Sequence, residues 1–92
     1  MTSAFAVPQF VRIRDGLMSK AEIDLDTASE IATACTVDPE DDPLATKLQH
    51  LIASSSGHLD GLVTFFEWEF DLELDVAIEA GTFLLSLHRM NQ

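Results

Sequence analysis

Residues 65–76 read "FFEWEFDLELDV", and this stretch decides the fold of the 92-residue chain. From Phe66 onward, apolar and acidic residues alternate without interruption. Such alternation is typical of a β-strand with one buried face, but two overlapping helical stripes produce the same local pattern. The flanking sequence must therefore distinguish the two interpretations.

The wider pattern from residue 59 to residue 90 favours a helix. At about 100° per residue, its apolar side chains fall into two stripes that each advance by three or four positions. One stripe holds Leu59, Leu62, Phe66, Phe70, Leu74, Ala77, Gly81 and Leu84. The other holds Phe65, Trp68, Leu72, Val76, Ala80, Phe83, Leu87 and Met90. We expect one long helix over residues 59–90, or a helical hairpin broken near Asp71 or Asp75, since either aspartate could serve as an N-cap.

The alternative is an α+β fold in which residues 62–76 form a strand paired with residues 5–14. Arg12 and Arg14 would then lie opposite the acidic side chains. Asp and Glu are depleted in strands, and no turn residue follows the proposed strand before Gly81. The helical interpretation is therefore preferred, and the strand remains the alternative.

The first 37 residues predict an arm followed by a helix. Residues 1–18 read as an extended arm that ends in an Asp15-Gly16 turn. A helix over residues 19–37 follows, because Ser19 and Glu22 have the spacing of a capping box.

The middle of the chain predicts a second short helix, over residues 43–56. Asp42 is its expected N-cap and Pro43 its first helical residue, and the Ser-rich segment before Gly57 ends it. No internal repeat is evident. The chain is thus predicted to be a single all-α domain, residues 1–92, forming a small bundle of three or four helices with an extended N-terminal arm.

The charge balance limits the partners of the chain. Sixteen acids stand against five bases, which gives a net charge of −11. This balance excludes a general nucleic-acid binder and disfavours anionic membranes, because both need clustered Lys and Arg. The N-terminus reads as neither a signal peptide nor a membrane span, and Cys35 is the only cysteine. We expect a cytoplasmic protein.

No residue pattern points to catalysis, a metal or a cofactor. The three histidines (His50, His58 and His88), with Asp60 and Cys35, match no compact zinc motif. The acidic segment "DPEDD" lacks the spacing of a calcium loop. Cys35 lies on the apolar face of the predicted helix and is expected to be an inert buried thiol. We expect no enzymatic activity.

The second apolar stripe predicts a binding surface. Two short helices can cover only one side of the helix, so the other side needs a second copy of the chain, a different partner protein or the folded-back arm of residues 1–18. The expected partner-binding residues are Phe65, Trp68, Leu72, Val76 and Phe83, with the acidic side chains Glu67, Glu69, Asp71 and Glu73 around them. We expect a homodimer that regulates or inhibits a partner by occluding a basic site, such as one that binds nucleic acid. The alternative is a structural subunit of a homo-oligomer.

Overall fold

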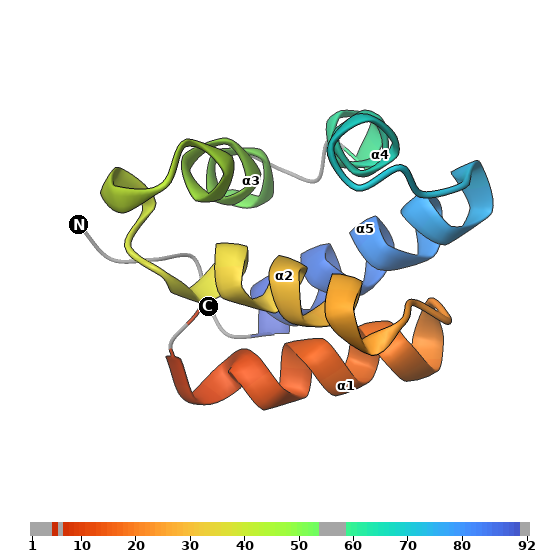
Figure 1. Cartoon of the computed structure of the whole chain (residues 1–92), viewed down its shortest axis with the longest axis horizontal. Helices are drawn as coiled ribbons and strands as arrows, with labels where there is room; N and C mark the ends of the chain where they lie inside the picture. The colour runs from red at the N-terminus through yellow and green to blue at the C-terminus, as the bar shows by residue number, and fades with distance from the viewer. Residues whose placement is uncertain (1–4, 6, 54–58, 91–92) are drawn as a thin grey trace.

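The computed structural model describes residue 5 and residues 7–53 and 59–90, and these ranges consist of helices and the short connections between them. Its elements are the α-helices α1 (Phe10–Lys20), α2 (Leu25–Thr36), α3 (Pro43–Ala53), α4 (Leu59–Glu69) and α5 (Leu74–Met90), and the 3₁₀ turns η1 (Val7–Gln9) and η2 (Pro39–Asp41) (Figure 1). The described ranges contain no strand. The all-α prediction is confirmed, and the alternative strand over residues 62–76, paired to residues 5–14, is wrong.

The alternating stretch contains the break between α4 and α5. Asp71 has a φ of 55°, which reverses the chain direction there. The backbone N–H groups of Phe70 and Leu72 both donate to the carbonyl of Phe66, at 3.2 and 3.3 Å. The region 59–90 is therefore a helical hairpin, and Asp71 ends the first helix of that hairpin instead of capping the second.

The predicted extended arm is wrong from residue 10 onward, because residues 10–20 form α1. Gly16 lies inside this helix, where the ring of Phe83 packs on its backbone. A Cβ on Gly16 would lie 2.1 Å from Cζ of Phe83. Tertiary packing thus overrides the weak helix propensity of glycine, which is a small term of about 1 kcal/mol.

The capping box expected at Ser19 is also absent. Ser19 lies in the last turn of α1, and Glu22 has a φ of 56° in the connection to α2. The helix expected over residues 19–37 therefore begins only at Leu25. The chain has five α-helices in its described part, where three or four were expected.

The predicted start of α3 is confirmed. The side chain of Asp42 accepts a hydrogen bond from the backbone N–H of Leu44 at 3.0 Å, and Pro43 is the first helical residue. The expected end of this helix, residues 54–56, lies outside the described residues. A buried amide fastens α3 to α2, because Nε2 of Gln49 donates to the carbonyls of Ala34 and Val37 at 2.9 and 2.8 Å.

The structure contains an internal repeat that the sequence does not make evident. Helix α4 begins 49 positions after α1, and α5 begins 49 positions after α2. The turns match as well, since the N–H groups of Ala21 and Ile23 both donate to the carbonyl of Leu17, at 3.1 and 3.3 Å. The aligned segments read "AEIDLD" (residues 21–26) and "FDLELD" (residues 70–75). The chain is two similar hairpins joined by α3.

The core lies between the two hairpins. In Figure 1, α1, α2 and α5 form the lower part of the molecule, while α3 and α4 lie side by side above them. The largest fully buried side chains come from the arm and from every α-helix: Phe5, Ile13, Leu17, Ile31, Cys35, Leu48, Leu62, Phe66 and Leu84. The surfaces of α3 and α4 that face away from α1, α2 and α5 are open to solvent (Figure 1).

Candidate functional site

The predicted interface residues do not form one exposed face. Phe65 is buried, and Leu72, Val76 and Phe83 are half-buried against the core. Trp68 alone among the predicted apolar contacts is open, with 83% of its surface exposed. The turn at residues 70–73 separates Phe65 and Trp68 on α4 from Val76 and Phe83 on α5, so the predicted stripe is not continuous.

The chain's own helices cover most of the second stripe. Phe83 packs on Gly16 of α1, so the segment predicted as an arm does cover the stripe, but as a helix. The ring of Phe65 contacts the rings of Phe66 and Phe70, with centroids 5.6 and 5.8 Å apart. Nζ of Lys47 on α3 lies 5.9 Å from the centre of the Phe65 ring. Trp68 and, at the far end of the stripe, Met90 are left exposed for a partner.

Trp68 stands beside a groove between α3 and α4. The groove has a volume of about 600 Å³ and is lined by Lys47, Leu51, Asp60, Gly61, Thr64, Phe65, Trp68 and Glu69. Helix α4 contributes residues three and four positions apart, and α3 contributes Lys47 and Leu51, one turn apart. Gly61 lets the helices approach closely, because a Cβ there would lie 3.1 Å from Cδ2 of Leu51.

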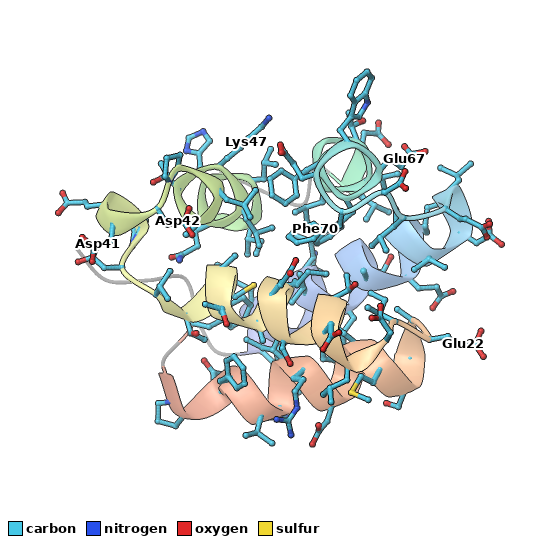
Figure 2. All side chains as sticks on the ribbon, viewed as in Figure 1. Glu22, Asp41, Asp42, Lys47, Glu67 and Phe70 are labelled. Carbon is cyan, nitrogen blue, oxygen red and sulfur yellow. The ribbon has the colours of Figure 1, made fainter. Side chains whose placement is uncertain are left out.

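Acidic side chains dominate the surroundings of Trp68. Glu69, Asp71 and Glu73 are exposed, and Glu67 is half-buried. Figure 2 shows Lys47 and Glu67 projecting from α3 and α4, while Phe70 points inward beneath α4. In the part of the chain that the structure describes, the one ion pair joins Arg14 and Asp15 at 3.1 Å. The carboxylates near Trp68 thus make no salt bridge within these ranges.

Two of these carboxylates are placed against the helix dipole. Glu67 and Glu69 lie in the last turn of α4, and that turn carries no basic residue. The C-terminal end of a helix carries a partial negative charge, which favours Lys or Arg there by about 0.3–1 kcal/mol. Acids at this end therefore reduce the stability of the helix. Residues that break a local rule in this way often serve a function instead.

The residues considered as metal ligands lie on different elements. His50 is exposed on α3, whereas His88 is half-buried with its ring 5.6 Å from that of Phe5. Cys35 is a free, buried thiol whose pKa is raised by desolvation. His58 lies outside the described residues. Among the residues that are described, no group of three or more His, Cys, Asp or Glu side chains could hold a metal ion.

The acidic segment "DPEDD" performs local structural roles. The side chain of Asp38 accepts a hydrogen bond from the backbone N–H of Glu40 at 3.0 Å, and Asp42 caps α3. Thr46 bonds back to the carbonyls of Pro39 and Asp42. These contacts hold η2 against the start of α3.

The α3 side of the groove was not predicted from the sequence. Gly61, Thr64, Phe65 and Trp68 have helical spacing, so a common face on α4 could have been found. The partner residues Lys47 and Leu51 depend on how α3 packs beside α4, and no pattern within one helix contains that information.

Comparison of the chain with protein-family models, curated proteins and solved structures found no match. Across the described residues, every helix falls short of the length and apolar character needed to cross a bilayer.

Proposed function

We propose that this chain is a small acidic protein-binding module without enzymatic activity, which regulates or inhibits a partner by covering a basic site. A site that normally binds nucleic acid would suit, because it presents Lys and Arg. The observation that supports the proposal is Trp68, which is 83% exposed among carboxylates that form no ion pair with any of the described residues.

An exposed tryptophan is an efficient anchor for a protein partner. Tryptophan buries a large apolar area on docking, and it is enriched among the residues that contribute most to binding energy. The surrounding Glu67, Glu69 and Glu73 would make charge-assisted hydrogen bonds with Lys or Arg. The net charge of −11 would in addition accelerate encounters with a basic surface.

The test begins with capture of a partner by the untagged protein and its identification by mass. The purified pair is then titrated while the emission of Trp68 is recorded, since the chain has one Trp and no Tyr. We expect a salt-sensitive complex that competes with the partner's own anionic ligand. The combined variant Glu67→Lys and Glu69→Lys should weaken the complex by about 100-fold, which corresponds to roughly 2.8 kcal/mol.

The same variant provides its own folding control. Because both substitutions place a base at the C-terminal end of α4, the melting temperature should stay the same or rise. Asp71 is left unchanged, since its φ of 55° would strain a lysine. Undiminished affinity in the refolded, fully helical variant would refute the inhibitory role.

A second candidate is a structural subunit of a homo-oligomer, and homodimerisation belongs to this proposal. Leu74 and Ile78 are 55% and 39% exposed, and they lie one turn apart on α5. A second copy could bury them together with Trp68. Light scattering of the wild-type chain and of Trp68→Asp tests this candidate, since equal masses would exclude an interface through Trp68.

A cytoplasmic location is likewise proposed, and the free thiol of Cys35 is consistent with it.

A further inference from the structure

We infer that the groove between α3 and α4 binds one basic amphipathic helix of a partner protein. A leucine-sized side chain from the apolar face of that helix enters between α3 and α4 beside Trp68. This inference rests on the proposed function, and it specifies both the site and the chemistry of the partner. Its basis is the combination of an apolar groove and a predominantly acidic rim.

The shape of the groove fits a helix. Helices α3 and α4 lie side by side and are seen nearly end-on in Figure 1, so the space between them runs along both axes. Grooves of this kind bind amphipathic helices, which insert apolar side chains at successive turns. The volume of about 600 Å³ lies within the usual range of binding pockets, roughly 300–1,000 Å³.

The interior of the groove is apolar. Leu51 and Gly61 are half-buried and Phe65 lies beneath them, while the large ring of Trp68 stands at one side. Nζ of Lys47 lies over the Phe65 ring at 5.9 Å. A cation in that position is held by the ring, and its alkyl stem adds apolar surface. A leucine-sized side chain of a partner would complete this packing.

The rim selects a basic partner over a second copy of the chain. Asp60 and Glu69 are exposed at the groove, and Glu67 follows on the same helix. Lys47 is the one base that lines the groove. Two copies of the chain, each with a net charge of −11, would repel one another at this surface. A helix with Lys or Arg beside its apolar face would instead find complementary carboxylates along the α4 side of the groove, at Asp60 and Glu69.

The probe is a synthetic helix with Leu on one face and Lys on the remaining faces. Binding is read from the emission of Trp68, which should shift to shorter wavelengths as the peptide covers the indole. A peptide with Glu in place of Lys should fail to bind. Equal binding of the Glu peptide would mean that apolar contact alone governs the site, and the inference would be overturned.

Thr64→Phe tests the location without changing the charge. Thr64 is exposed and lines the groove, so a phenyl ring there should occupy the space and weaken binding by about tenfold or more. Thr82→Phe is the matched control, because Thr82 is exposed on α5 and does not line the groove. Circular dichroism confirms the helix content of both variants. Equal affinities for the two variants would contradict a site in the groove.

A pair of charge reversals separates this inference from the proposed function. Asp60→Lys with Glu69→Lys alters the groove, whereas Glu30→Lys with Glu40→Lys makes the same charge change on α2 and η2. We expect a loss of about 30-fold for the first pair and less than about threefold for the second. Equal losses would show diffuse attraction, which overturns the groove but leaves an acidic binding module.

The remaining outcomes are equally decisive. If the wild-type chain is dimeric and Thr64→Phe makes it monomeric, a second copy occupies the groove and the inference is wrong. If the Lys peptide does not bind and the untagged protein captures no partner, the proposed function fails together with the inference.

Discussion

Gly16 and Phe83 form a close contact between the first hairpin and the second. A Cβ on Gly16 would lie 2.1 Å from Cζ of Phe83, and 2.6 and 2.8 Å from the two Cε atoms of that ring. The repeat shows how this fit arises. Phe65 occupies the position in the second hairpin that Gly16 occupies in the first, and Ala34 likewise corresponds to Phe83. One hairpin carries small residues where the other carries rings.

Gly16→Ala should therefore destabilise the protein. Overpacking costs about 1–3 kcal/mol. The higher helix propensity of alanine offsets about 1 kcal/mol of that cost. In a Phe83→Ala background the added methyl group meets no ring, so the same substitution should be neutral or stabilising. Urea unfolding of the four proteins in this double-mutant cycle measures the coupling. Additive effects of the two substitutions would show that the contact does not limit the size of residue 16.

At the scale of the elements, both hairpins turn on an acidic residue with positive φ. Glu22 and Asp71 have φ values of 56° and 55°. A left-handed conformation costs an ordinary residue about 1–2 kcal/mol, while Asp tolerates it better than Glu. The chain thus holds more strain at Glu22 than at Asp71, although the two turns have matching hydrogen bonds.

Glu22→Gly should accordingly stabilise the protein by about 0.5–1 kcal/mol, after the greater entropy of glycine in the unfolded chain is subtracted. Asp71→Gly should have a smaller effect in the same direction. The control is Asp24→Gly, because Asp24 has a φ of −67° and gains nothing from glycine. Thermal unfolding of the three variants ranks them, and a destabilised Glu22→Gly would mean that the Glu22 side chain makes a compensating contact.

These turns also show where sequence reasoning succeeds and where it fails. The start of α3 was predictable, because Asp42 and Pro43 act through local hydrogen bonding and local geometry. The helical character of residues 59–90 was predictable from a pattern that spans thirty residues. The turn after α4 was placed only approximately, since neither Glu22 nor Asp71 is a residue type that marks a left-handed turn strongly.

The N-terminal helix was missed for a different reason. Its sequence contains Gly16 and the β-branched residues Val11 and Ile13, all of which lower helix propensity. Helix α1 is stabilised by contacts with α2 and α5, and the contacts with α5 join residues far apart in the chain. The candidate site was predictable in the same partial sense. Trp68 and its acidic neighbours were identified. The cover over Phe83 was considered only as a folded-back arm, and the contact of Lys47 with Phe65 was not predicted.

At the scale of the whole molecule, charge opposes folding. Of 16 acidic residues, all within the described ranges, only Asp15 makes a salt bridge there. The radius of gyration is 11.5 Å, and the Debye length at 0.1 M salt is about 10 Å. The charges that give the net charge of −11 therefore lie within about one or two Debye lengths of one another. Compaction therefore brings carboxylates together without compensating bases, and part of the stability gained from the core is lost to repulsion.

Raising NaCl from low concentration to about 0.5 M should consequently raise the melting temperature. A gain of about 1 kcal/mol would correspond to roughly 4–8 °C for a domain of this size. The variant Glu67→Lys with Glu69→Lys removes two acids and adds two bases, so its response to salt should be clearly smaller. A wild-type melting temperature that does not change with salt would show that the carboxylates repel one another too weakly to matter. In that case the clustering of carboxylates around Trp68 would need no functional explanation, because it would not lower the free energy of unfolding.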